Sequence, residues 1–188
     1  MSTKTSELLA VAAPRTVAVV RGIPDEQLDL PTPCPDYSVR DLLRHVYDVV
    51  VNFQSLARRQ EVDWSGKTDH LTDGWRDRFA AETGRLVEAW SDPAALEGVS
   101  AGMGLPQETV GEMALIDLAV HGWDLARATG QRLEVDPAVL AAGHGFMDRM
   151  GETGQQMGAF GAPVPTRADA TPLDELLART GRDPGWTA

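Results

Sequence analysis

The sequence of 188 residues has a single cysteine and no long apolar segment. Because Cys34 stands alone, no disulfide can form within the chain, and such sparse cysteine use is typical of a reducing compartment. No segment approaches the roughly 20 consecutive apolar residues that a membrane-spanning helix needs. The first twenty residues do not resemble a signal peptide, since Pro14 and Arg15 interrupt their apolar run and Glu7 precedes it. We therefore predict a soluble, cytoplasmic protein that does not contact a membrane.

Positive charge is also scarce. The chain has 17 Lys and Arg against 28 Asp and Glu, which gives a formal net charge of −11. No stripe of basic residues could neutralise phosphates, so we expect no nucleic-acid partner. The "GMG" at 102–104 is not followed by the Lys-Ser/Thr of a phosphate-binding loop, and no serine or cysteine nucleophile motif occurs.

Helical periodicity dominates what is present, and strand-like alternation is rare. Hydrophobic (43%) and charged (24%) shares are ordinary for a globular protein, and the length suits one domain over residues 1–188. A proline-rich connector at 30–38 leads to a helix that opens with a capping box, Ser38 and Asp41, and Pro14 should kink or split the first helix. The sequence predicts an all-α bundle with helices at about 6–21, 38–59, 72–90, 107–128, from about 137, and 172–179.

Two of these helices carry ionisable residues on apolar faces. Asp117 and His121 are four residues apart, so both side chains leave the same side of their helix about 6 Å apart. His45 lies between Leu42 and Val49 on the apolar side of the helix at 38–59. Two imidazoles and a carboxylate could hold one divalent metal. The spacing equally allows a solvated Asp117 and a core His121 that bonds a backbone carbonyl.

Three further residues have two interpretations each. Asp124 follows His121 by three residues, and it either accepts a hydrogen bond from that histidine or pairs with Arg127 or a backbone group. His144 is either a fourth ligand or acid/base group, or a structural residue. Cys34 is either a thiolate near the metal or a small buried side chain. His70, in a polar loop, is expected to be solvated.

Three blocks of the sequence together resemble a known superfamily. They are "LPTPCPDYSVRDLLRHV", "LIDLAVHGWDLARATGQ" and "FGAPVPTRADATPLDELLARTGRDPGW". In this order they are similar to actinobacterial metal-binding proteins of the DinB and mycothiol-dependent maleylpyruvate isomerase superfamily. The resemblance implies a four-helix bundle of up-down-down-up type, here with extra short C-terminal helices. It also implies a homodimer and a bound divalent metal, zinc or nickel.

The resemblance also implies which residues bind the metal and what the metal does. The histidine of the second helix matches His45, and the later pair matches Asp117 and His121. The isomerase branch has a glutamate where this chain has the shorter Asp117. The resemblance implies a metal-dependent enzyme that uses a low-molecular-weight thiol, as a mycothiol-dependent isomerase or S-transferase. A metal-binding protein without turnover, in stress response or metal handling, and a metal-free buried polar network are the alternatives.

Overall fold

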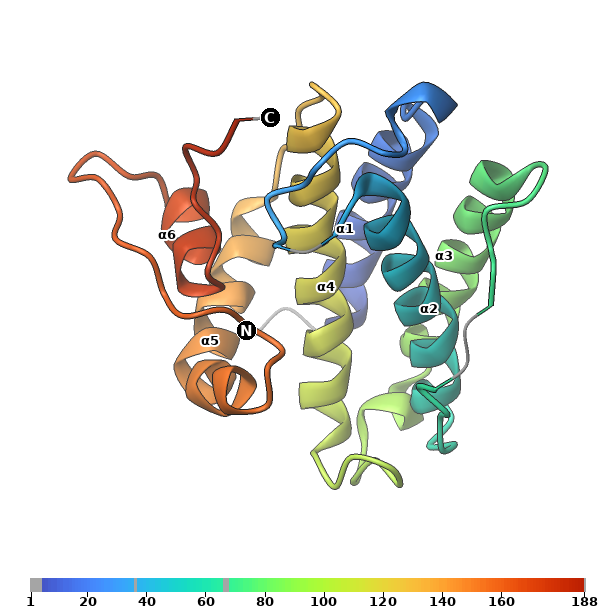
Figure 1. Cartoon of the computed structure of the whole chain (residues 1–188). Coiled ribbons are helices and arrows are strands. Elements are labelled where there is room, and N and C mark those ends of the chain that lie inside the picture. The colour runs from blue at the N-terminus through green and yellow to red at the C-terminus, as the bar shows by residue number, and fades with distance from the viewer. Residues whose placement is uncertain (1–4, 36, 66–67, 188) are drawn as a thin grey trace.

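A computed structural model describes residues 5–35, 37–65 and 68–187, and the regular elements among these residues are helices, with no strand (Figure 1). Two isolated backbone bridges, Pro31 to Ser38 and Val99 to Pro106, close the connectors before two of the helices. The elements are α1 (Thr5–Arg21), η1 (Asp25–Gln27), α2 (Val39–Ala57), α3 (Trp75–Ser91), η2 (Pro93–Leu96), α4 (Gln107–Ala128), α5 (Pro137–Gln156) and α6 (Pro172–Arg179). The predicted all-α class is confirmed.

Local signals account for most helix ends. The Ser38 hydroxyl accepts from the backbone N–H of Asp41, and the Asp41 carboxylate accepts from the backbone N–H of Ser38, as the predicted capping box requires. Helix α3 begins later than predicted, at Trp75, because Gly74 has a left-handed conformation (φ 74°) that ends the preceding turn. Pro14 does not split α1, which is one continuous helix.

Four helices form a closed bundle. Helix α1 packs against α3 and α4, and α2 packs against the same two helices. Arg21 at the end of α1 pairs with Asp77 at the start of α3, while Gln107 at the start of α4 donates to the carbonyl of Leu56 at the end of α2. Figure 1 shows α1 and α4 running in one direction and α2 and α3 in the other.

Helices α5 and α6 pack outside this bundle, against α4 and against each other. At 20 residues α5 is longer than the extra short C-terminal helices that the resemblance implied, whereas its start agrees with the helix predicted from about residue 137. The segment between α5 and α6 is extended and lies along α6, where the backbone N–H of Val164 donates to the carbonyl of Ala178. After α6 the chain turns at Gly181 (φ 85°) and returns towards α4.

Helix α4 is central, because α1, α2 and α5 all pack against it. Its side chains are buried on nearly every face, which explains why its sequence has so little purely polar surface. A Cβ added at Gly122 would lie 2.8 Å from the hydroxyl oxygen of Thr16, so glycine there permits close approach of α1. None of the described helices is both long enough and apolar enough to span a membrane.

Candidate metal centre

The structure brings His45, Asp117 and His121 together between α2 and α4. The rings of His45 and His121 meet edge to face, with centroids 4.9 Å apart, and His121 Nε2 lies 3.7 Å from Asp117 Oδ1. One donor atom from each residue lies within 4.8 Å of the other two. His121 is buried, whereas His45 and Asp117 are partly exposed, so one side of the cluster is open. The predicted juxtaposition is present; the role of these residues as metal ligands stays a prediction.

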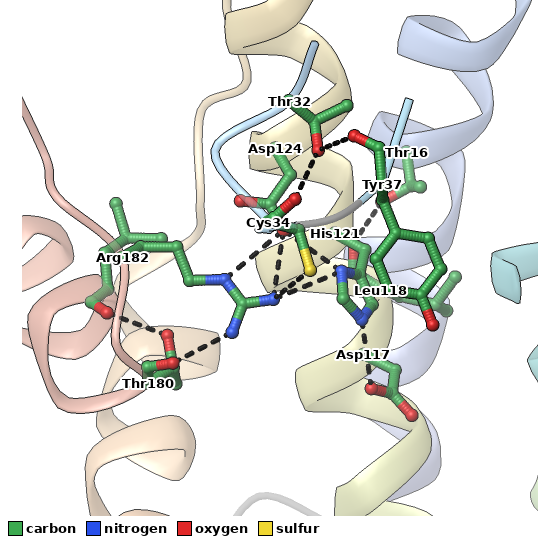
Figure 2. A network of polar contacts seen from close by, with 11 residues as sticks. Thr16, Thr32, Cys34, Tyr37, Asp117, Leu118, His121, Asp124, Thr180 and Arg182 are labelled. Carbon is green, nitrogen blue, oxygen red and sulfur yellow. Dashed lines mark hydrogen bonds and ion pairs between the residues drawn. The ribbon is translucent and has the colours of Figure 1, made fainter. Parts of the chain in front are cut away.

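Asp124 sets the orientation of the His121 ring. Its Oδ2 lies 3.0 Å from His121 Nδ1, and the Asp124 side chain is fully buried (Figure 2). An ionised carboxylate can only accept, so Nδ1 carries the proton and the lone pair of a neutral ring is on Nε2, which faces Asp117. The alternative partner considered for Asp124 was wrong, since Arg127 donates to the carbonyl of Trp186. The hydrogen bond to Asp124 therefore keeps His121 Nε2, the candidate ligand atom, facing Asp117.

A buried arginine completes this arrangement. Arg182 is only 5% exposed, and its Nη2 lies 3.2 Å from Asp124 Oδ2 and 3.5 Å from His121 Nδ1 (Figure 2). Its Nη1 donates to the carbonyl of Thr180 at 2.9 Å. Arg182 could not be identified from the sequence, because it follows the last helix and no periodicity marks such a residue as buried. Its guanidinium compensates a carboxylate that would otherwise be buried without a counter-charge.

Cys34 contacts the same guanidinium. Its Sγ is 3.4 Å from Arg182 Nη2, and the thiol is half-buried rather than enclosed. The Thr32 hydroxyl braces this connector through the carbonyls of Cys34 and Tyr37, at 3.0 and 2.9 Å. Donor atoms of Cys34, His121 and Asp124 also lie within 4.8 Å of one another. A cation bound there would meet the positive charge of Arg182, so this second group fits a metal less well than the first.

Burial and neighbouring charge favour the neutral form of His45. Burial lowers the pKa of His45 below its ordinary value, and His121 and Arg182 lower it further, while Asp117 and Asp48 act in the opposite direction. A neutral imidazole has the lone pair that metal binding requires. The electrostatics of the cluster therefore favour the form of His45 that can be a ligand.

The two remaining histidines lie outside the cluster. His144 Nε2 donates to the carbonyl of Pro172 at 2.9 Å, which ties α5 to the start of α6 and gives His144 a structural contact. The expectation of a solvated His70 was wrong. Its Nε2 lies 2.8 Å from Asp48 Oδ1 and its ring stacks on Tyr47 at 4.1 Å, because the connector before α3 folds back along α2.

The sequence is similar to one domain family and to two known proteins. The mycothiol maleylpyruvate isomerase N-terminal domain matches residues 9–126, a segment that contains His45, Asp117, His121 and Asp124 but not Arg182. Two Mycobacterium tuberculosis proteins, uncharacterized protein Rv0738 of strain H37Rv and uncharacterized protein MT0763 of strain CDC 1551, are each 29% identical over 180 residues. These alignments cover 88% of this chain and 90% of each relative. No solved structure matches the chain significantly. Since the domain match covers well over half of the sequence, the chain belongs to the family of the mycothiol maleylpyruvate isomerase N-terminal domain.

Proposed function

We propose that the chain binds one divalent metal, zinc or nickel, through His45, Asp117 and His121. The observation that carries the proposal is the cluster of three donor atoms within 4.8 Å of one another, with His121 Nε2 directed at Asp117 by the hydrogen bond to Asp124. Two imidazoles and one carboxylate are a common set for these metals. The donor set therefore fits the group that the family implies.

The cluster has the features of a reactive rather than a structural metal site. Three protein ligands leave a position open for water or substrate, and the partly exposed Asp117 (side chain 27% exposed) gives access to it. A metal bound here would lower the pKa of a coordinated water or thiol towards neutrality. Asp124 holds the ring of His121, and Arg182 holds Asp124, so two buried residues keep a ligand in place.

We infer that the chain is a metal-dependent enzyme that uses a low-molecular-weight thiol, in the manner of a mycothiol-dependent isomerase or S-transferase. Membership of the mycothiol maleylpyruvate isomerase N-terminal domain family supports this inference. The partly exposed Asp117 carboxylate, which leaves one side of the cluster accessible to a small molecule, also supports it. The homodimer and the cytoplasmic location expected from the sequence belong to the same proposal.

Metal content tests the first part of the proposal. Protein purified without chelator is analysed by mass spectrometry of its metals, as wild type and as the variants His45→Ala and His121→Ala. The matched control is His144→Ala, which removes a histidine outside the cluster. Wild type and His144→Ala should retain zinc or nickel in near-stoichiometric amount, and the two cluster variants should lose most of it. Equal metal content in all four proteins would contradict the proposal.

Thiol response tests the second part. The metal-loaded wild type should gain thermal stability with mycothiol, should gain little with glutathione, and should lose the mycothiol effect after chelation. Metal binding without any response to mycothiol would instead support a metal-binding protein without turnover.

A further inference from the structure

A cavity of about 420 Å³ adjoins the cluster at Asp117, on the side of α4 that faces α5. Residues of α4 and α5 line it, and further lining comes from Trp64 and from residues within 102–105 and 157–160. Its volume lies in the lower half of the range for small-molecule sites in proteins. The cavity can therefore enclose a small organic molecule next to the candidate metal centre.

Thioethers and aromatic rings are prominent in the lining of this cavity. Four methionines reach it, and thioether side chains are flexible enough to pack against ligands of varied shape. Aromatic lining comes from Trp64, Phe146 and Phe160. The methionines are Met103, Met113, Met150 and Met157.

The rim of the cavity is apolar as well. Trp64 is 49% exposed and Met157 is 76% exposed, and both are among the few large hydrophobic residues on the described surface that are not covered. Exposed apolar side chains that continue into a hollow are typical of a binding site rather than of isolated surface residues. The entrance and the interior therefore favour the same kind of ligand.

The described side chains of the lining offer an acidic ligand no cationic partner. Among the described residues that line the cavity, Asp117 is the only charged side chain, and no Lys or Arg is present. Arg182 does not line the cavity, because its guanidinium is directed at Asp124 and Cys34. A carboxylate placed among the methionines, away from the proposed metal at Asp117, would lose its hydration without gaining a cationic side chain as a partner, which is unfavourable.

We propose that this cavity binds an uncharged, largely apolar small molecule and presents it to the metal centre at Asp117. Presentation of the molecule to the metal centre rests on the metal- and thiol-dependent function proposed above, whereas binding in the cavity does not. Maleylpyruvate, the substrate in the family's name, is a dicarboxylate, and the apolar lining is unsuited to it. The chain thus takes a different class of molecule as the second reactant of its thiol chemistry.

Binding of a neutral fluorescent probe, N-phenyl-1-naphthylamine, tests whether the cavity takes an uncharged, largely apolar molecule. The full chain is titrated after treatment with chelator, so that the result does not depend on metal. Met150→Trp and Met113→Trp fill the cavity from α5 and α4, and Val11→Trp, on the exposed side of α1, is the matched control. Thermal melts of all variants confirm that each is folded.

We expect saturable binding to wild type and Val11→Trp, at least roughly tenfold weaker binding to the folded cavity variants, and displacement by neutral aromatic compounds but not by maleate. Absent saturation would overturn the proposal. So would unchanged binding to both cavity variants, or displacement by maleate as effective as by a neutral compound.

Cobalt(II), a paramagnetic substitute for the metal, tests whether the molecule in the cavity lies next to the metal centre. Bound cobalt should broaden the proton resonances of the bound probe in wild type and not in His121→Ala. If the probe binds to cobalt-loaded wild type without broadening of its resonances, the cavity does not present its ligand to the metal. Failure of wild type to bind cobalt would instead refute the proposed function and leave the apolar cavity site intact.

Discussion

At the scale of single residues, Asp124 explains why three ionisable groups lie along one line of a buried helix. A fully buried carboxylate is unfavourable unless it is paired and hydrogen-bonded. Its Oδ2 has both kinds of partner, His121 and Arg182, whereas its Oδ1 has no hydrogen-bond partner among the described residues. The acid thus connects a candidate metal ligand to the C-terminal segment, and its two partners lead to two separate predictions.

The first prediction concerns stability. Arg182→Met removes the guanidinium and leaves the Asp124 carboxylate without its counter-charge in the interior. Breaking a buried ion pair from one side costs about 3–5 kcal/mol, so the free energy of unfolding in urea should fall by about this amount. The double variant Arg182→Met with Asp124→Leu should recover part of the loss, because no unpaired charge remains.

An exposed arginine provides the control for that measurement. Arg167 pairs with Asp169 on the surface, so Arg167→Met should change the free energy of unfolding by less than about 0.5 kcal/mol. Equal urea midpoints for Arg182→Met and Arg167→Met would show that the buried pair has no such role.

The second prediction concerns metal affinity. Asp124→Asn keeps the size of the side chain but replaces the charged acceptor of the His121 Nδ1 proton by a weaker, neutral one. Loss of such a carboxylate typically weakens metal binding by roughly 10–100-fold, and we expect zinc affinity to fall within this range in a chelator competition assay. Asp148→Asn alters only a surface pair with Arg179 and should bind zinc like wild type. Unaltered affinity in Asp124→Asn would separate this carboxylate from metal binding.

At the scale of elements, the start of α2 illustrates how much local sequence determines. Ser38, Asp41 and the prolines before them specify the first residue of the helix that carries His45, and the structure agrees. The effect of Pro14 was not predictable in the same way. The packing of α1 against α3 and α4 keeps the helix continuous despite the lost backbone donor, and tertiary packing cannot be derived from one segment.

The third prediction follows from this cap. Ser38→Ala removes the hydroxyl that accepts from the Asp41 backbone N–H, and loss of such a cap costs about 1 kcal/mol. The Ser38 hydrogen bond lowers the pKa of Asp41 below the ordinary 3.8. A lowered pKa stabilises the folded protein above pH 3.8, and this contribution disappears as the pH falls through the pKa of the folded state.

The difference in urea midpoint between wild type and Ser38→Ala should therefore be largest near neutral pH and shrink below pH 3.8. Ser91→Ala, which removes an exposed hydroxyl at the end of α3, should show little difference at any pH. A difference in urea midpoint between wild type and Ser38→Ala that grows below pH 3.8 would contradict this direction of the pH dependence.

At the scale of the whole molecule, the sequence was informative about helices and less so about what they bring together. Asp117 and His121 were predictable as neighbours because four residues make about one helical turn. Their meeting with His45 rested on two separate apolar faces and on a family resemblance. Arg182 could not be found, because its position depends on how the segment after α6 returns to α4. The apolar cavity likewise depends on the packing of α5 against α4.

The fourth prediction concerns this returning segment. Residues 181–187 join two distant parts of the chain, since Arg182 contacts both Asp124 and Cys34, and the carbonyl of Trp186 accepts from Arg127 Nε. A chain that ends at residue 180 should therefore show faster hydrogen exchange at the end of α4 and in residues 31–35. Among the described residues, helix α3 has no hydrogen bond or ion pair to residues 181–187, and its exchange should stay close to that of wild type.

Full-length Arg182→Met separates the guanidinium from the rest of the segment. It keeps the backbone acceptor for Arg127, so it should accelerate exchange in residues 31–35 while protecting the last turn of α4 better than the truncated chain does. Uniformly faster exchange over all helices in the truncated chain would point to global destabilisation. Faster exchange restricted to the end of α4 and to residues 31–35 would instead identify the C-terminal segment as the support that holds His121 and the proposed metal site in place.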